Sequence, residues 1–585
     1  MGWEPQERLE FFLDELAIGM LQKFVIRFSY CVNFLIKSKS FEVLTISSIG
    51  VNGSIQEGGM KILVSDQLAE SGIEKLMAVP DFDVEVNTSL TPEELRQVIK
   101  EYDALVIRSS TKVTEDIIEA AQRLKVIARA GIGLDNVDIA AASKRGIVVM
   151  NAPEGNVITT AEHAIAMLLS LSRNIPQATA SIKEGKWEKK KFRGKEVFNK
   201  VLGIIGVGRI GRVVVDRAKG LKMNVIAYDP YISKQSIEKM GIEAVSLDEL
   251  YARADYITVH TPITNETRNL INADAFQKMK GGVFILNCAR GGIVDEAALY
   301  DAIQAGIVAG AALDVFSKEP PKDNPLLSLD RVIATPHLGA STDEAQENVA
   351  LAVADQVIDF LLRGTIRNAV NAPMIDGEVL ATLRPHLIVA EKLGCVLAQI
   401  MRGAIEEVSI EYIGDTSALD TRPLTISVLK GMLTPFLSDE VNFVNAPIIA
   451  RERNIKVTES VRKEAEDFTN LISVTMKTNE ERQLVAGTIF GKRDARLVRI
   501  NDFRLEAAME GHLVLIYNID TPGTIGAIGN TLGRHNVNIS MMNVGQVLER
   551  GQNIIFLRTD TPVPPHVVQE LLRLENVNVV QVLEL

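Results

Sequence analysis

The chain has 585 residues, and at about 150 residues per domain this length predicts roughly four domains. A composition of 46% hydrophobic and 24% charged residues is typical of globular proteins and excludes a fibrous or wholly disordered chain. The net charge of −12 argues against nucleic acid as a partner, because phosphate binding needs a basic face. The cysteines form no CxxC pair, so we expect no metal site and a reducing, cytoplasmic setting. No apolar run is long enough to predict a membrane span.

The first 59 residues contain no motif that indicates a function, whereas Met60 opens a clear first strand. We therefore expect that translation starts at Met60 and that residues 1–59 are misassigned upstream sequence. The alternative is a genuine but dispensable N-terminal extension.

Residues 60–156 alternate short apolar runs with helix-forming stretches, the rhythm of βαβ units in a parallel sheet. A helix is predicted at Thr91–Lys100, with Thr91 as its N-cap, Pro92 at its first position and Glu94 completing a capping box. The predicted strands are Lys61–Val64, Asp83–Val86, Ala104–Ile107, Val126–Arg129 and Val148–Met150.

The βαβ rhythm returns over Val201–Ala334. Ala161–Ser172 is apolar around almost its whole circumference, so we expect a buried helix that joins the two units. Thr342–Leu362 predicts a long helix that crosses back to the first unit, which makes that unit discontinuous.

The pattern changes after residue 375. Residues 376–505 alternate strands and helices without a Gly-rich phosphate loop. Residues 511–585 predict a compact βαββαβ unit. Its elements are expected at His512–Asn518, Ile525–His535, Val537–Val547, Asn553–Thr559, Pro565–Leu574 and Val577–Leu583.

A dinucleotide-binding pattern, GxGxxG, follows the predicted strand Val201–Ile205. Such glycines make a tight turn, admit a pyrophosphate to the backbone and let the next helix pack on the strand. Asp229 ends the following strand, where it can bind ribose hydroxyls and repel a 2′-phosphate, so NAD is favoured over NADP. The alternative is a Gly-rich turn in an unrelated α/β sheet. The glycines of the motif are Gly206, Gly208 and Gly211.

Arg290, Glu319 and His337 each follow a predicted strand of the second unit, and such strand ends line the ligand crevice of a parallel sheet. The set suits oxidation of a 2-hydroxy acid. The histidine takes the hydroxyl proton, the glutamate pairs with it and raises its pKa, and the arginine binds the substrate carboxylate. Taken singly, each residue has an ordinary alternative: a structural histidine, a surface ion pair or a turn.

Longer stretches around these residues resemble the signatures of the D-isomer-specific 2-hydroxyacid dehydrogenase family, and the likeness is greatest to its long-form branch, which ends in an ACT domain. It covers about residues 60–585. The stretches that carry it are Arg108–Thr114, Ala128–Asp138, Asn151–Pro153, Asn287–Glu296, Ala312–Phe316 with Glu319 and Pro320, and His337–Thr342.

The resemblance implies an NAD-dependent enzyme that oxidises 3-phospho-D-glycerate to 3-phosphohydroxypyruvate, the first committed step of L-serine biosynthesis. It implies an α/β fold with two Rossmann-like doubly wound parallel-sheet domains, an α+β intervening domain and a ferredoxin-like ACT domain. The implied divisions are a substrate domain at 60–156 and 343–375, an NAD-binding domain at 157–342, an intervening domain at 376–505 and an ACT domain at 511–585.

The same likeness assigns residues to sites. Arg290, Glu319 and His337 fall on the catalytic positions. The implied substrate-binding residues are Arg108, Ser109, Arg129, Gly131 and Arg290. The implied cofactor contacts, besides the motif glycines and Asp229, are Ile132, Arg209, Ile210, Thr261, Cys288, Ala289, Asp314, Gly339 and Ala340.

In that family the ACT domain binds L-serine, and the implied effector-binding residues are Asn518, Asp520 and Asn538. Asn518 departs from the His or Tyr that relatives carry there. The family also implies a homotetramer, and it implies that the basic run Lys186–Lys191 approaches a neighbouring subunit's active site. The alternative for that run is a solvated charged surface.

Two other functions remain open. An enzyme of the same chemistry acting on unphosphorylated glyoxylate, hydroxypyruvate or 2-oxoglutarate would share the catalytic residues. A non-enzymatic, NAD-sensing co-repressor could retain them as well. Arg108 and Arg129 favour a phosphorylated substrate, and the acidic net charge favours a metabolic enzyme.

Overall fold

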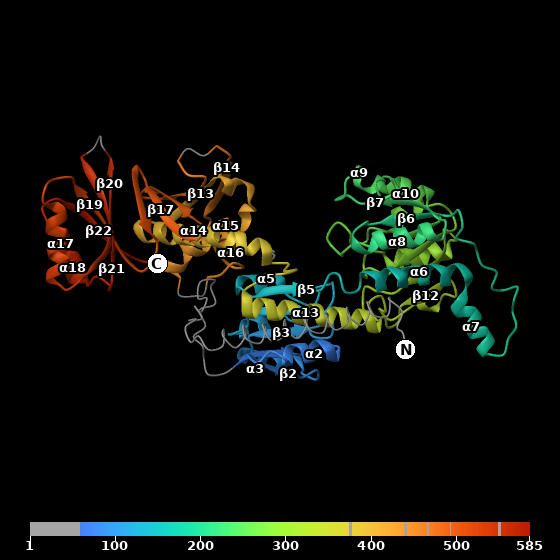
Figure 1. Ribbon diagram of the computed structural model, residues 1–585. Coiled ribbons are helices and arrows are strands. Elements are labelled where there is room, and N and C mark those ends of the chain that lie inside the picture. The colour runs from blue at the N-terminus through green and yellow to red at the C-terminus, as the bar shows by residue number, and fades with distance from the viewer. Residues whose placement is uncertain (1–58, 374–376, 438–440, 465–466, 492, 548–550) are drawn as a thin grey trace, which may run out of the picture. The chain divides into compact units, whose positions relative to one another are not determined.

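The computed structural model describes residues 59–373, 377–437, 441–464, 467–491, 493–547 and 551–585 of the chain. The predicted N-terminal extension lies outside them except for Gly59. Within these ranges the chain forms four sheets (Figure 1). None of the helices in the same ranges is both long and apolar enough to cross a membrane.

The first sheet is parallel throughout, with the order β2-β1-β3-β4-β5, and its predicted strands are confirmed to within one residue at each end. Apolar side chains pack on both of its faces, as a doubly covered parallel sheet requires. Its strands are β1 (Met60–Val64), β2 (Phe82–Val86), β3 (Ala104–Ile107), β4 (Val126–Arg129) and β5 (Val148–Asn151). Its helices are α2 (Glu70–Met77), α3 (Pro92–Val98), α4 (Glu115–Ala120) and α5 (Ile139–Lys144).

The predicted capping box starts α3. The Thr91 N–H donates to Glu94 Oε2 at 2.9 Å, and the Glu94 N–H donates to Thr91 Oγ1 at 3.3 Å. The α-helix ends at Val98, and a 3₁₀ turn over Ile99–Glu101 continues the segment that the sequence predicted as helix.

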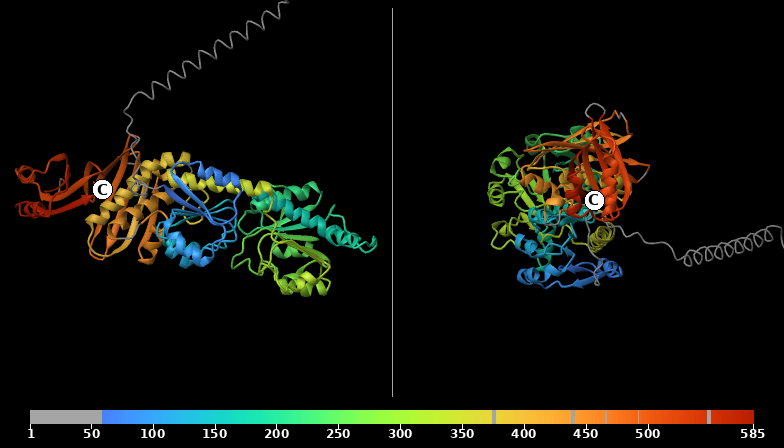
Figure 2. Two further views of the ribbon diagram at one scale, coloured as in Figure 1. Left: turned by 90° about the horizontal axis from the view of Figure 1, so that it is seen from below. Right: turned by 90° about the vertical axis from the view of Figure 1, so that its left-hand side faces the viewer.

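The long helix α13 (Asp343–Arg363) returns the chain to the first sheet. Val349, Val353 and Val357 of α13 pack in the same hydrophobic cluster as the strands β1 and β3 to β5. α13 lies beside α2 in both Figure 1 and Figure 2, and an ion pair of 2.7 Å between Lys75 Nζ and Asp355 Oδ1 joins the two helices. The first unit is therefore discontinuous in sequence.

The second sheet has seven parallel strands in the order β12-β11-β10-β9-β6-β7-β8. The chain runs outward from β6 in one direction and from β9 in the other, so a crevice forms between these two strands at their carboxyl ends. The strands are β6 (Val201–Ile205), β7 (Asn224–Tyr228), β8 (Glu243–Ala244), β9 (Tyr256–Val259), β10 (Val283–Asn287), β11 (Val308–Leu313) and β12 (Val332–Ala334). The helices between them are α8 (Arg209–Gly220), α9 (Lys234–Glu238), α10 (Leu247–Arg253), α11 (Ala273–Lys278) and α12 (Glu296–Gln304), with a 3₁₀ turn at Pro325–Ser328.

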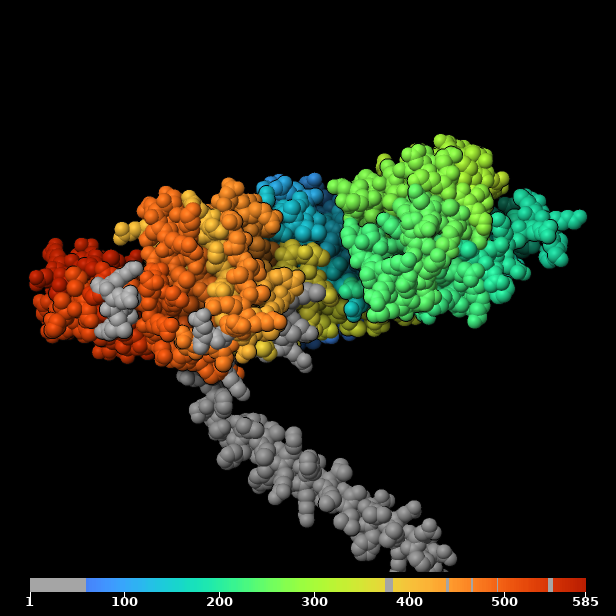
Figure 3. All heavy atoms as spheres, turned by 90° about the horizontal axis from the view of Figure 1, so that it is seen from above, coloured from blue at the N-terminus to red at the C-terminus, as the bar shows by residue number. Residues whose placement is uncertain are grey.

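The helix predicted at Ala161–Ser172 is α6 (Val157–Arg173), and it is buried on one side only. Within the predicted range, Glu162 and Ala166 are exposed. The prediction of a wholly buried helix is wrong for that face, because apolar residues on a helix do not by themselves ensure a partner. α7 (Ile175–Lys183) and the loop after it stand out from the rest of the domain (Figure 3).

The third sheet is mixed, with the order β14-β13-β15-β16-β17-β18, and the fourth is antiparallel, with the order β20-β21-β19-β22. The predicted βαββαβ unit is confirmed. The strands of the third sheet are β13 (Ile405–Gly414), β14 (Lys456–Arg462), β15 (Asn470–Thr478), β16 (Arg482–Phe490), β17 (Asp494–Ile500) and β18 (Phe503–Ala508). The same unit contains α14 (Gly377–Ile400), α15 (Thr421–Leu433) and α16 (Ala446–Glu452), with 3₁₀ turns at Asp415–Ala418 and Thr434–Phe436. The last unit consists of β19 (His512–Ile519), α17 (Thr524–Arg534), β20 (Ile539–Val547), β21 (Gln552–Thr559), α18 (Pro565–Leu572) and β22 (Val577–Glu584).

Candidate active site

A cleft of about 940 Å³ opens at the carboxyl ends of strands from both parallel sheets. Arg108 follows β3 and Arg129 ends β4, while Cys288 follows β10 and Asp314 follows β11. Doubly wound sheets bind their ligands at such strand ends. The predicted site residues that line the cleft are Arg108, Ser109, Arg129, Gly131, Ile132, Arg209, Ile210, Thr261, Cys288, Ala289, Arg290, Asp314, Glu319, His337, Gly339 and Ala340.

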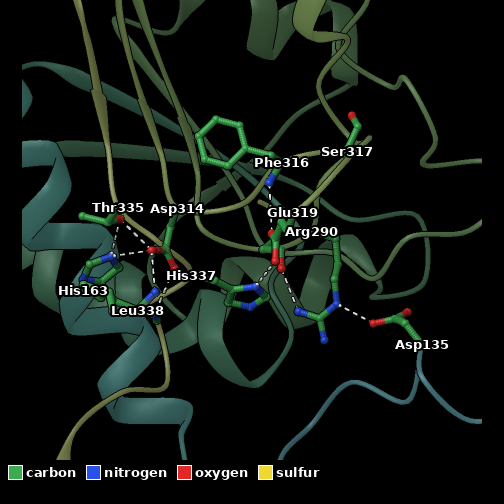
Figure 4. A network of polar contacts seen from close by, with 12 residues as sticks. Asp135, His163, Arg290, Asp314, Phe316, Ser317, Glu319, Thr335, His337 and Leu338 are labelled. Carbon is green, nitrogen blue, oxygen red and sulfur yellow. Dashed lines mark hydrogen bonds and ion pairs between the residues drawn. The ribbon is translucent and has the colours of Figure 1, made fainter. Parts of the chain in front are cut away.

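His337 and Glu319 form an acid–base pair in the cleft (Figure 4). His337 Nδ1 lies 2.8 Å from Glu319 Oε2. Because an ionised carboxylate only accepts hydrogen bonds, Nδ1 carries the proton, and Nε2 is left to exchange a proton with a ligand. Glu319 Oε1 accepts a hydrogen bond of 3.1 Å from the N–H of Phe316, which fixes the orientation of the carboxylate.

The loop that carries His337 is held by Asp314. The Leu338 N–H donates to Asp314 Oδ1 at 2.7 Å, and the Gly339 N–H donates to Oδ2 at 2.8 Å. The N–H of His337 itself donates to the Asp314 carbonyl oxygen at 2.9 Å, and His337 has a φ of 55°. Burial opposes ionisation of Asp314, but its hydrogen bonds outweigh burial and hold the pKa of this carboxyl below its usual value.

Arg290 reaches from the second sheet to the first. Its Nε donates to Asp135 Oδ2 at 3.1 Å, and its Nη1 donates to the Ala289 carbonyl oxygen at 2.7 Å. Gly133 lies so close that a Cβ built on it would be 2.2 Å from Arg290 Nη2. Since these contacts engage Nε and one N–H of Nη1, the N–H groups of Nη2 and the second N–H of Nη1 remain for a carboxylate.

Arg108 and Arg129 add positive charge beside Arg290. Arg129 is largely buried, and its Nε has no hydrogen-bond partner among the residues that the structure describes. Burial, together with the charges of Arg290 and Arg108, lowers the pKa of Arg129 to about 10. Clustered guanidinium groups repel one another, so the cleft is built to receive an anion.

The GxGxxG glycines and Asp229 do not line the cleft, although Arg209 and Ile210 of the same motif do. The glycines lie between β6 and the first turn of α8, and Asp229 follows β7. A Cβ on Gly211 would lie 2.1 Å from the Gly206 carbonyl oxygen, so the glycine is needed for α8 to pack against β6. A Cβ on Gly208 would meet no atom within 4 Å, which leaves space above the helix N-terminus. Asp229 accepts from the Val207 N–H at 2.9 Å, which holds its carboxylate against the loop.

Three side chains at this site were missed by the sequence interpretation. His260 directly follows β9, and burial lowers its pKa to about 4, so the ring is neutral near pH 7. Its position at a strand end was a signal that could have found it. Asp135 and His163 gave no such signal, because their partners, Arg290 and Asp314, lie more than a hundred residues away.

Family models match three parts of the chain. They describe the D-isomer specific 2-hydroxyacid dehydrogenase NAD binding domain (residues 165–339), the D-3-phosphoglycerate dehydrogenase intervening domain (382–501) and the ACT domain (512–576). The D-3-phosphoglycerate dehydrogenase of Methanocaldococcus jannaschii is 45% identical over 527 residues, which are 90% of this chain and 100% of that protein. The protein of the same name from Bacillus subtilis is 40% identical over 90% of this chain and 99% of its own length. The chain belongs to the D-3-phosphoglycerate dehydrogenase family.

Solved structures share the fold of about half the chain. The TT0316 protein from Thermus thermophilus is 32% identical with a TM-score of 0.50, and the match covers 53% of this chain and 100% of that one. A glyoxylate reductase from Paecilomyes thermophila is 29% identical with a TM-score of 0.50, over 53% of this chain and 98% of that one. Because the second is named for an unphosphorylated substrate, the shared fold does not by itself decide the substrate.

NAD is the cofactor of this family's nucleotide-binding domain, and the described residues fit it. The open space at Gly208 and the N-terminus of α8 suit a pyrophosphate. Asp229, at the end of β7, is placed for ribose hydroxyls. Thr261 Oγ1 is buried in the cleft wall and has no hydrogen-bond partner within the described part of the chain, so it has a hydrogen bond to offer a ligand.

In the ACT domain, the predicted effector residues Asn518 and Asn538 lie far apart. β19 and β20 run parallel on either side of β21. Asn518 lies near the end of β19, whereas Asn538 comes just before the start of β20. At 3.3 Å per residue, the two ends of this sheet lie roughly 20 Å apart. A site that uses both residues therefore needs two copies of the chain.

The side chains of these asparagines also have partners of their own. Asn518 is only 1% exposed, and its Nδ2 donates to the Ile519 carbonyl oxygen at 2.9 Å. Asn538 Nδ2 donates to Asp560 Oδ2 at 2.6 Å. Asn518 is therefore not displayed on the surface of a single chain, and its effector role stays a prediction.

Proposed function

We propose that this protein oxidises 3-phospho-D-glycerate to 3-phosphohydroxypyruvate with NAD, the first committed step of L-serine biosynthesis. The observation that carries the proposal is one cleft that combines the His337–Glu319 pair with three arginines, Arg108, Arg129 and Arg290. A proton acceptor suits a 2-hydroxy acid. The arginines suit a substrate that bears both a carboxylate and a phosphate.

Bound NAD supplies the acceptor for the hydride that leaves C2 of the substrate. His337 Nε2 takes the hydroxyl proton as the C–H bond breaks, and the Glu319 carboxylate stabilises the imidazolium that forms. Arg290 binds the substrate carboxylate through its terminal nitrogens and polarises the C2–O bond. In the reverse direction, the His337 imidazolium returns the proton to the carbonyl oxygen.

Arg108 and Arg129 bind the phosphate. Both side chains line the cleft and come from the ends of first-sheet strands. Arg108 Nη1 donates to the Gln67 carbonyl oxygen at 3.2 Å and keeps further N–H groups for a ligand. A phosphate dianion would offset the burial and the repulsion by Arg290 and Arg108 that together lower the pKa of Arg129.

The test is NADH consumption by the purified full chain with phosphohydroxypyruvate, hydroxypyruvate, 2-oxoglutarate and glyoxylate. The proposal predicts a strong preference for phosphohydroxypyruvate. Preference for an unphosphorylated oxoacid would leave the catalytic pair in place but refute the substrate. NADH binding without turnover of any oxoacid would favour a co-repressor-type scaffold instead.

We propose further that L-serine is an effector of the ACT domain and that the protein acts as a homotetramer in the cytoplasm. The separation of Asn518 and Asn538 in one chain supports an effector site shared between copies. Reaction rates measured with and without L-serine, together with light scattering to determine the mass, test both points. A monomer, or a rate that L-serine leaves unchanged, would contradict them.

A further inference from the structure

His163 is an ionisable side chain that takes no part in the proposed proton and hydride transfer. It lies beside the loop that carries His337. It lies on α6, and its side chain is 18% exposed. Its Nε2 is 3.2 Å from Asp314 Oδ1 and 3.2 Å from Thr335 Oγ1 (Figure 4). His163 is not among the residues that line the cleft, so it acts on the reaction only through its neighbours.

The hydrogen bonds of Thr335 and Asp314 determine which nitrogen of His163 carries a proton. The Thr335 hydroxyl has a single hydrogen, and it donates that hydrogen to Asp314 Oδ1 at 2.6 Å. Towards His163, Thr335 Oγ1 can therefore only accept, as can the ionised Asp314 carboxylate. His163 Nε2 must then carry a proton, which it shares between the two oxygens.

Asp314 links the Nε2 proton of His163 to the loop that carries His337. Its side chain is fully buried, and its other donors, Thr335, Leu338 and Gly339, all belong to the segment that contains His337. Among the described residues, His163 is the donor to this carboxylate that comes from a different element. The imidazole therefore connects α6 to the loop whose conformation sets the position of His337.

We propose that His163 is a positioning residue for the dehydrogenase reaction: it donates from Nε2 to Asp314 and Thr335 and so fixes the carboxylate that holds the His337 loop. The inference rests on the proposed function, because His337 is the proton acceptor of that reaction. His163 touches neither substrate nor cofactor in this role.

The first test compares His163→Leu with His163→Gln in the full chain. Leucine removes the donor, so kcat falls by about 10-fold or more, towards the roughly 10²-fold that a small misplacement of a catalytic group costs. Glutamine places an N–H at similar reach and restores most of kcat. Glu162→Gln, on the exposed face of the same helix, serves as the control and keeps the wild-type rate.

The second test is a double-mutant cycle with Thr335→Val, which removes the hydroxyl but keeps the shape. If His163 acts through this network, the double variant loses less activity than the two single losses multiplied together. Wild-type kcat in His163→Leu, equal losses in the Leu and Gln variants, or strictly multiplicative losses would each overturn the proposal.

A third readout does not depend on turnover. Diethyl pyrocarbonate modifies accessible histidines, and mass spectrometry of the peptide that contains His337 gives the rate at that residue. His163→Leu should change this rate, whereas His163→Gln should not. If wild type turned over no oxoacid, the proposed function would fail, yet this measurement would still decide the positioning role. Equal rates in all three proteins would refute it.

Discussion

In the proposed mechanism, His337 and Glu319 have different roles because the two imidazole nitrogens face different partners. Nδ1 is held at 2.8 Å by the Glu319 carboxylate, so only Nε2 can exchange a proton with a ligand. Sequence motifs predicted this pair and Arg290 correctly as members of one cleft. Motifs could not predict the partners from remote elements, such as Asp135 on Arg290, because those contacts depend on how the chain folds.

His337→Ala should lower kcat by about 10²–10⁴-fold, since it removes the proton acceptor. NADH binding, followed by fluorescence titration, should stay intact because no cofactor contact is assigned to the ring. His566→Ala, which changes an exposed histidine of α18, is the matched control. A wild-type rate in His337→Ala would refute the assignment of the base.

Arg108→Ala should raise the KM for phosphohydroxypyruvate by roughly 10- to 100-fold, the equivalent of one charge-assisted hydrogen bond. The KM for hydroxypyruvate, which has no phosphate, should change much less. Arg96→Ala removes an exposed arginine of α3 that does not line the cleft, and it should affect neither value. Equal increases in KM for both substrates would show that Arg108 does not bind the phosphate.

His260 should make the fold sensitive to acid. Burial lowers its pKa from 6.5 to about 4, so the unfolded chain binds this proton before the folded chain does. Stability is therefore lost as pH falls from about 6.5 to 4. Melting temperatures across this range should fall more steeply for wild type than for His260→Asn, with His566→Asn as the control. Identical slopes for wild type and His260→Asn would contradict the assignment.

At the scale of helices and strands, local signals located the strands of the first sheet and the elements of the last unit. Strands of the first sheet were predicted to within one residue because they are short and bounded by turn residues, and because most are apolar runs, while β2 alternates apolar and acidic residues. The exposed face of α6 was not predicted, because an apolar helix surface looks the same in sequence whether or not another surface covers it. Ala166 is the clearest example, because it lies within the predicted segment and is exposed.

The packing of α8 on β6 should depend on Gly211. A Cβ there would lie 2.1 Å from the Gly206 carbonyl oxygen, so Gly211→Ala must displace the helix or the loop. Overpacking of this kind costs about 1–3 kcal/mol, and NADH binding should weaken by about 10-fold. Gly220→Ala, at the other end of α8, meets no atom within 4 Å and is the control. Equal NADH affinity in both variants would show that the loop does not need this glycine.

At the scale of the whole molecule, the parallel first two sheets and the βαββαβ last unit followed from the sequence. The alternation of strands and helices predicted for residues 376–505 is wrong for β14 to β18, which follow one another without a helix among the described residues, and distances between sites were not predicted. The βαββαβ pattern predicted the last unit correctly, yet only the strand pairing shows that Asn518 and Asn538 lie at opposite ends of its sheet. Strand register is set by packing between distant segments, so a single sequence does not reveal it.

That separation predicts complementation between copies of the chain. Asp520→Ala and Asn538→Ala should each abolish inhibition by L-serine when they form oligomers alone. Mixed oligomers of the two variants should regain part of it, because one intact site can form from two different chains. Mixed oligomers that stay insensitive, beside a wild type that is inhibited, would contradict a shared site.

In the proposed function, the cleft selects a phosphorylated 2-hydroxy acid for oxidation by NAD. The most direct measurement is the formation of NADH by the full chain from 3-phospho-D-glycerate and from D-glycerate, each with NAD. The arginines beside His337 predict a kcat/KM for 3-phospho-D-glycerate that exceeds that for D-glycerate by roughly 10-fold or more, since the phosphate contributes at least one charge-assisted contact. Equal kcat/KM values for the two substrates, or a higher value for D-glycerate, would contradict the proposed function.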